Sequence, residues 1–206
     1  MDSTAAEDIA YLRKIAELGK KLPIQGGEFG ILWGGMYAFA AVYAYLVLTG
    51  IIVISTTSVA MAFLLPIPVG VVLGHVLSKK RTRASGVASF GNRTSAAAWS
   101  AVWISTGVLY FTVLSFKWWG FLKLPEGYIF GALQAVLFGM YAVAYATTAQ
   151  SSGDNRQFVF SGFALLAAVA SILTMNSYQM FLVMAAGLLL SAVLPGFLTR
   201  THYELD

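Results

Sequence analysis

Residues 29–78 read FGILWGGMYAFAAVYAYLVLTGIIVISTTSVAMAFLLPIPVGVVLGHVLS, and this stretch contains no Asp, Glu, Lys or Arg. Charged residues are also missing from three later stretches, 94–116, 127–153 and 157–199. Each stretch can hold at least one helix of about 20 residues, the length that crosses ~30 Å of hydrocarbon. Charged residues make up 11% of the chain, whereas an average soluble domain has roughly 25%. The pattern therefore indicates an integral membrane protein.

The first and last uncharged stretches are too long for one span, and each contains a pair of residues that is typical of a turn. These pairs are Thr49-Gly50 and Asn176-Ser177. Only helices and closed barrels satisfy their backbone hydrogen bonds in lipid, and spans of this length and apolarity indicate helices. We predict an all-α integral membrane protein whose domain, residues 26–199, contains one bundle of six transmembrane helices at about 28–49, 53–77, 95–116, 128–149, 157–175 and 177–198.

The basic residues are distributed unevenly between the two ends of the predicted spans. Eleven Lys and Arg residues fall in the N-terminal segment, in the loop after the second span, at Arg156 and at Arg200, whereas only Lys117 and Lys123 fall on the opposite side. Lys and Arg are enriched in cytoplasmic connections. We therefore expect both termini, including the tail 200–206, to be cytoplasmic in a multi-pass protein of the bacterial inner (plasma) membrane.

The N-terminal segment, residues 1–25, contains the one candidate helix outside the bilayer. Within residues 4–20, apolar side chains recur every three residues, as expected of an amphipathic helix. Such a helix either docks on a partner or lies on the inner leaflet or against the cytoplasmic end of the bundle. The net charge of +4 requires no nucleic-acid partner, because the basic loop 79–93 lies where anionic lipid attracts cations.

Small residues recur at every fourth position in three of the predicted spans. Such stripes allow the backbones of transmembrane helices to approach closely. The spacing does not tell whether the neighbouring helix comes from the same chain or from another membrane protein. The predicted helix-packing residues are Gly26, Gly30, Gly34, Ala38, Gly70, Gly74, Gly131, Ala135 and Gly139.

Residues that carry catalysis or bind metals are missing from the predicted spans. All nine acidic residues fall at or outside the ends of the spans, and the chain has no cysteine. Of the two histidines, His75 lies near the cytoplasmic end of the second span and His202 lies in the tail. Membrane enzymes and ion-coupled carriers normally place ionisable groups at bilayer depth. We therefore expect no catalytic residue, no metal ligand, no cofactor and no enzymatic activity.

A few polar or helix-breaking residues could still line a pore or a ligand site. Pro66 and Pro68 remove two helix donors in the middle of the second span, which should kink or open there. Gln134 is the one strong amide well inside a span, and it either lines a pore or forms an interhelical hydrogen bond. His75 completes this set.

Two short motifs occur once in each half of the chain. KLP stands at residues 21–23 and 123–125, and GMYA stands at residues 35–38 and 139–142. Two homologous halves of three spans each would have opposite orientations in the membrane, as in many transporters. The alternative is a chance match between abundant residue types, and it is favoured because the third and sixth spans show almost no similarity.

Two functions agree with these observations. The first is a non-catalytic subunit, scaffold or regulator that binds other transmembrane helices. The alternative is a homo-oligomeric passive channel or facilitator for a small neutral or weakly acidic solute. Six spans in 206 residues with cytoplasmic termini resemble the small hexameric channels of the urea and acetate families. The NPAPLGL signature of the acetate family is absent, and the first span starts with GGEFGIL, so no pore residue is assigned from this resemblance.

Overall fold

The computed structural model describes residue 9 and residues 27–84 and 90–200. Six of its helical segments are long and apolar enough to cross a membrane, and the described residues form no strand. The predicted six-helix, all-α architecture is therefore confirmed. The elements are α2 (Gly27–Leu48), α3 (Thr57–Leu64), α4 (Pro66–Ala84), α5 (Phe90–Trp118), α6 (Glu126–Ser152), α7 (Arg156–Leu173), α8 (Gln179–Leu188), the π-helical turn η1 (Leu189–Val193) and α9 (Leu194–Arg200).

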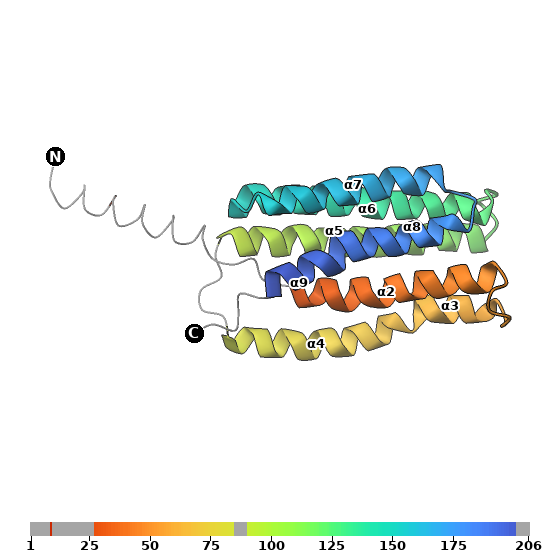
Figure 1. Cartoon of the computed structure of the whole chain (residues 1–206), viewed down its shortest axis with the longest axis horizontal. Helices are drawn as coiled ribbons and strands as arrows, with labels where there is room; N and C mark the ends of the chain where they lie inside the picture. Colours follow the sequence, from red (N-terminus) through yellow and green to blue (C-terminus); the bar gives the residue numbers. More distant parts are fainter. Residues whose placement is uncertain (1–8, 10–26, 85–89, 201–206) are drawn as a thin grey trace.

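The helices run side by side along the long axis of the molecule (Figure 1). With 22 residues, α2 is about 33 Å long at 1.5 Å per residue, which matches the thickness of a bilayer. Gly50 and Asn176 adopt positive φ angles of 78° and 63° in the turns that follow α2 and α7. The two predicted breaks, Thr49-Gly50 and Asn176-Ser177, are thus confirmed, because both turns require the left-handed region that Gly and Asn enter most easily.

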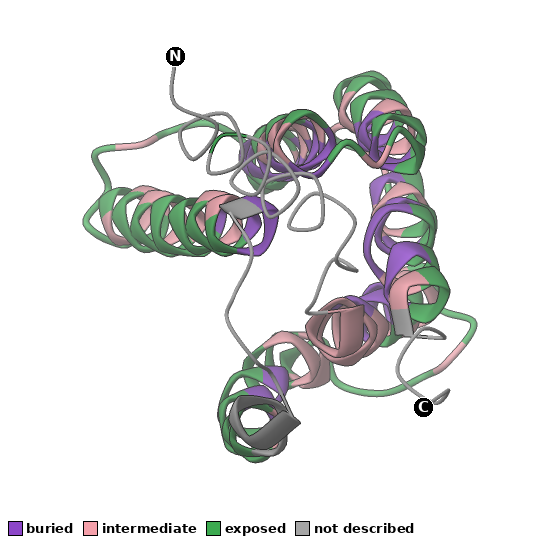
Figure 2. Cartoon of the chain, turned by 90° about the vertical axis from the view of Figure 1, so that its left-hand side faces the viewer, coloured by how far each residue is buried: buried purple, intermediate pink, exposed green. Residues whose placement is uncertain are grey.

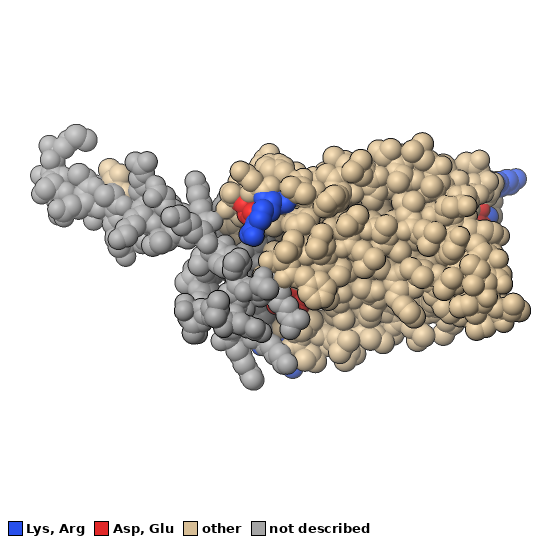
Figure 3. Space-filling model, viewed as in Figure 1, with Lys and Arg blue, Asp and Glu red and all other residues tan. Residues whose placement is uncertain are grey.

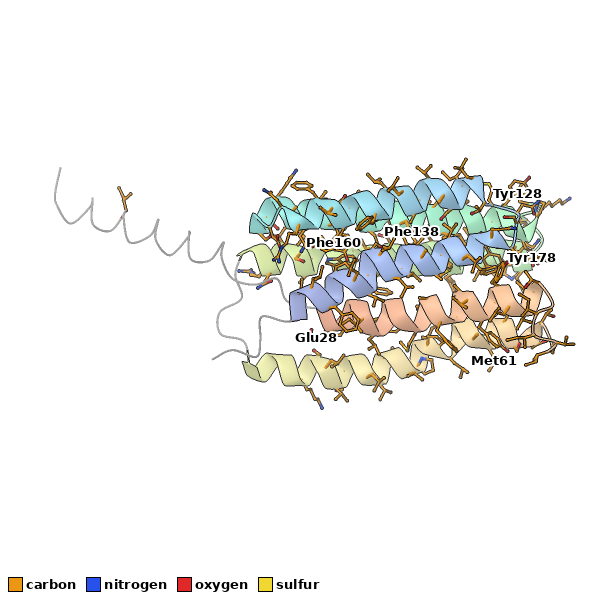
Figure 4. The ribbon with its side chains drawn as sticks, in the orientation of Figure 1. Glu28, Met61, Tyr128, Phe138, Phe160 and Tyr178 are labelled. Carbon is orange, nitrogen blue, oxygen red and sulfur yellow. The ribbon has the colours of Figure 1, made fainter. Side chains whose placement is uncertain are left out.

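Charged side chains lie at the two ends of the bundle, and the surface between them is uncharged in the view of Figure 3. Lys79, Arg93 and Arg156 lie at the end where α2 begins, whereas Lys117 and Lys123 lie at the other end. At that second end, Trp118, Tyr128 and Tyr178 are exposed, and Figure 4 shows the two tyrosines there, far from Glu28. Exposed aromatic residues at this level are typical of a membrane interface.

The helices form a curved row and do not fill a central cluster (Figure 2). The row begins with α5, which packs on α6, and α6 packs on α7. Next, α7 packs on α8 and η1, and these pack on α2. The row ends with α3 and α4, which both pack on α2. Within this row α6 is the most buried span. The core contains Phe138, Tyr141 and Leu188 together with many alanines, and Figure 4 shows Phe138 inside the bundle.

The second span is divided into two helices. Helix α3 ends at Leu64, and α4 begins at Pro66, with Leu65 between them. Because proline has no backbone N–H and its ring clashes with the preceding turn, the predicted interruption of this span is confirmed. Pro66 is buried, whereas Pro68 is exposed on the outside of α4.

The packing order allows the helix contacts of the two halves of the chain, which share the KLP and GMYA motifs, to be compared. If the halves correspond span by span, the contact of α2 with α3 and α4 matches that of α6 with α7. The contact of α5 with α6 likewise matches that of the last span with α2. The contact of α7 with α8 has no counterpart, because α4 does not pack closely on α5.

The predicted amphipathic helix at residues 4–20 falls outside the described residues except for Ile9.

Helix α2 approaches the last span closely at three glycines, Gly27, Gly30 and Gly34. A Cβ atom on Gly30 would lie 2.6 Å from the carbonyl oxygen of Ala192, and one on Gly34 would lie 2.8 Å from the Ala192 side chain. These glycines therefore face a helix of the same chain. Gly35, the next residue of α2, has open space around it.

We expect Gly30→Ala to lower the stability of the folded bundle, because the added methyl group meets backbone atoms that cannot rotate away. Overpacking of this kind costs about 1–3 kcal/mol, which corresponds to a Tm lower by roughly 2–12 °C in a protein of this size. Gly35→Ala is the matched control, and it should leave the Tm equal or higher because alanine favours helix. Equal melting of the two variants in detergent would contradict the contact.

Candidate functional site

The predicted helix-packing residues occupy several different environments. Gly70 faces the ring of Trp33, with 2.5 Å from a built Cβ to the nearest ring atom, and Gly74 faces Phe29. Gly131 packs against Met175, whereas Gly139 has nothing within 4 Å of a built Cβ. Ala38 is buried in the core, Ala135 is partly exposed, and Gly26 lies outside the described residues. The glycine positions thus include close contacts within the chain and one open position on α6.

The polar residues predicted as candidates do not come together. Gln134 is buried, and its side-chain N–H donates to the carbonyl oxygen of Met180 at 3.1 Å. This is an interhelical hydrogen bond between α6 and α8. His75 is exposed on α4, as is Pro68. The four candidates therefore do not share one pocket.

Hydrogen bonds from side chains, two of them to backbone carbonyl oxygens, fix α6 against its neighbours. Besides Gln134, the Ser161 hydroxyl of α7 donates to the carbonyl oxygen of Ala142 at 2.8 Å. The Thr148 hydroxyl contacts that of Ser95 on α5 at 3.2 Å. Such bonds contribute about 0.6 kcal/mol each in a membrane, and their directionality fixes how far each helix is shifted along its neighbour.

Sequence reasoning did not find the contact between Tyr145 and the last span. The Tyr145 hydroxyl donates to the carbonyl oxygen of Ser191, which lies in the π-helical turn η1. Four residues later stands Pro195, which has no N–H to bond that carbonyl. The wider turn accommodates the proline ring, and Tyr145 satisfies the freed acceptor. Pro195 within an apolar stretch is the signal that could have pointed to this site.

Two groups of aromatic rings fill the space between the helices. In the first group, Trp33 of α2 lies 5.4 Å from Trp103 of α5 between ring centroids, and Tyr37, Phe63 and Phe181 continue the series. In the second group, Trp99 contacts Tyr141 and Tyr145, which contact Phe138 and Phe160. The Trp33–Trp103 pair links α5 to α2 across the open side of the row.

The two spans at the ends of the row, α5 and the span formed by α3 and α4, have the smallest share of buried residues. In the most apolar part of α5, 6% of the residues are buried, and for the span formed by α3 and α4 the share is 17%. Each of the other four spans has at least 33% buried. On α5 the exposed side chains include Ile104, Val108 and Phe111. Most of the surface of α5, α3 and α4 is therefore available to lipid or to another protein.

A small network orders the turn between α6 and α7. The Arg156 guanidinium and backbone N–H both donate to the Asp154 carboxylate, at 2.9 and 3.1 Å, and the Gln157 amide donates to it at 3.3 Å. Burial raises the pKa of the Asp154 carboxyl, but the hydrogen bonds from Arg156 and Gln157 outweigh this effect and hold its pKa below the ordinary value of 3.8. The carboxylate also stands at the N-terminus of α7, where negative charge is stabilising.

Among the described residues, no group of three or more His, Asp or Glu side chains is arranged to hold a metal ion. Comparisons with models of protein families, with curated proteins and with solved structures found no match for this chain. The arrangement of its own residues is thus the basis for any proposal about function.

We expect Tyr145→Phe to destabilise the bundle, because the Ser191 carbonyl then loses its donor from α6. The loss should be about 0.5–1.5 kcal/mol. In a Pro195→Ala background the same change should cost less, because the introduced alanine supplies a backbone N–H that can bond the Ser191 carbonyl. Tm values of the single and double variants measure this coupling. An equal effect of Tyr145→Phe in both backgrounds would contradict the assignment.

The lowered pKa of Asp154 predicts a small dependence of stability on pH. A depressed pKa stabilises the fold above the ordinary Asp value, and this stabilisation is lost as the pH falls below 3.8 through the lower pKa of the folded state. Asp154→Asn should remove that part of the acid sensitivity. The effect is at most about 1 kcal/mol because the pair is partly exposed. Melting curves between neutral and strongly acidic pH, with Glu126→Gln as the control, test it.

Proposed function

We propose that this protein is a non-catalytic subunit, scaffold or regulator of a larger assembly in the bacterial inner membrane, with both termini in the cytoplasm. The observation that carries the proposal is the incomplete packing of α5, α3 and α4. These helices end the row, and each of the two spans packs mainly on a single neighbouring helix, α6 or α2. A partner that covers them would complete the packing that the chain leaves open.

The exposed side of α5 has the features of a helix-binding face. Ile104 and Phe111 are 68% and 75% exposed, and Gly107 between them has nothing within 4 Å of a built Cβ. Two apolar side chains on either side of a small residue allow another helix to approach closely, and association in lipid depends on such packing. The hydrophobic effect supplies little in a bilayer, so close contact has to supply the affinity.

The interior gives more support to a packing role than to a channel. Gln134 uses its amide on the Met180 carbonyl, and Tyr145 uses its hydroxyl on the Ser191 carbonyl. Gln134, the predicted pore candidate, and Tyr145 therefore both hold helices together. The aromatic rings of Trp33 and Trp103 occupy the space between α2 and α5, where a solute would otherwise approach from the open side of the row.

Single cysteines in this cysteine-free chain test the proposed face. Ile104→Cys and Phe111→Cys, each carrying a photoactivated cross-linker, should yield in native membranes an adduct with one protein of defined mass. Leu166→Cys on α7 is the matched control, because Leu166 is 67% exposed on a helix that packs against neighbours on both sides. It should yield lipid adducts alone.

Two results would contradict the proposal. One is a protein adduct no more abundant at residues 104 and 111 than at residue 166. The other is a permeability of proteoliposomes to urea, acetate or glycerol above that of empty liposomes, which would support the homo-oligomeric channel, especially if the adduct has twice the mass of this chain.

A further inference from the structure

A groove runs between α5 and α6 on the outside of the bundle, with a cavity volume of about 680 Å³. Ligand sites in proteins typically have volumes of about 300–1,000 Å³. Ala97, Ala101, Val136 and Val143 are exposed on its walls, and Gly139 leaves open space at its middle. The groove is thus apolar and faces the surroundings of the bundle.

The length of the groove indicates what can fill it. On α5 it extends from Thr94 to Ser105, which corresponds to about 16 Å at 1.5 Å per residue. This is about half of the ~30 Å hydrocarbon thickness, the depth of one leaflet. A transmembrane helix of a partner would need a groove along the full depth, whereas one acyl chain needs only its own leaflet.

The groove becomes polar at the end where α5 begins. Thr94 and Thr147 line it there, and the adjacent residues Arg93 and Gln150 are exposed. The Arg93 guanidinium forms no ion pair or hydrogen bond in the described part of the chain. Arginine binds phosphate through several parallel N–H donors. An acyl chain in the groove would bring its phosphate to the level of Arg93, which lies about 100° around α5 from Thr94, so the guanidinium would reach the phosphate by means of its long side chain.

We propose that the α5–α6 groove binds one anionic phospholipid of the leaflet at this end, with an acyl chain between the helices and the phosphate at Arg93. The hydroxyls of Thr94 and Thr147 and the amide of Gln150 are the neutral donors beside it. The acyl-chain part of this site is separate from the helix-binding face proposed for α5, and the site requires no protein partner.

Gly139→Leu is the direct test of the acyl-chain site. A leucine would fill part of the groove, and its Cβ fits without a clash because a Cβ built on Gly139 has nothing within 4 Å. Gly107→Leu is the matched control, because Gly107 also has open space but does not line the groove. Equal Tm and elution volume of the three proteins establish that each is folded.

Native mass spectrometry of the whole protein, titrated with phosphatidylglycerol or phosphatidylcholine in mixed micelles, measures the binding. Wild type and Gly107→Leu should bind one phosphatidylglycerol tightly, and Gly139→Leu should bind it about tenfold more weakly. Equal binding by all three proteins would overturn the proposal. So would a dimer of the chain that Gly139→Leu abolishes, because a second copy, instead of a lipid, would then occupy the groove.

The charge at the end of the groove is tested separately. Arg93→Gln should reduce the preference for phosphatidylglycerol over phosphatidylcholine, whereas Lys79→Gln, which removes a charge at the same end of the bundle, should not. An unchanged preference in Arg93→Gln would overturn the assignment of the phosphate. These measurements use isolated protein and therefore do not depend on a protein partner. Lipid binding can be found even if cross-linking at residues 104 and 111 detects no partner, and it can be absent even if cross-linking detects one.

Discussion

The close contact between α2 and the last span is the constraint on which the rest of the arrangement depends. Because α2 also carries α3 and α4 on its other side, its position fixes one end of the row. The last span is fixed on two sides, by α2 and by α6, at two consecutive residues. The Ala192 carbonyl lies against Gly30, and the Ser191 carbonyl accepts the Tyr145 hydroxyl of α6. In a regular α-helical turn the Pro195 ring would clash with the preceding turn at this place. The π-helical turn avoids this clash and presents the Ser191 carbonyl to Tyr145, so it contributes to the contact between the two halves of the chain.

Much of the fold follows from the sequence because a bilayer permits few alternatives. The gaps between charged residues mark the six spans, and Gly50, Asn176 and Pro66 mark interruptions whose backbone chemistry is local. The neighbours of a helix are different, because they depend on surfaces distant in sequence. The spacing of Gly30 and Gly34 predicts a close contact but does not identify Ala192. Gly139 belongs to a stripe of the same spacing, but a Cβ built on it has nothing within 4 Å, so a stripe of small residues alone cannot distinguish a filled groove from an open one.

The structure divides into a well-connected centre and two peripheral spans. In the centre, Gln134 and Ser161 connect α6 with α8 and α7 through backbone carbonyl oxygens. These bonds resist sliding of one helix along another more than apolar contacts do, since each has one acceptor position. At the periphery, α5 retains the Thr148–Ser95 contact and the rings of Trp99 and Trp103, but much of its length has no protein on the outer side. A change in the position of α5 would therefore disturb fewer directional bonds than a change in α7.

The groove and the helix-binding face of α5 are compatible because they lie on different sides of one helix, and Arg93, which is on the side of Phe111, stands about three turns from Ile104 at the start of the helix. At about 100° per residue, Ala101 and Ser105 lie within about 40° of each other, as do Ile104 and Phe111, and the two pairs are centred about 90° apart. A lipid between α5 and α6 would support α5 from the side that the aromatic rings do not reach. Because a lipid in that position restricts how α5 can tilt, it would also reduce the ordering that a partner has to impose on Ile104 and Phe111. Lipid binding would then strengthen partner binding without any contact between the two ligands.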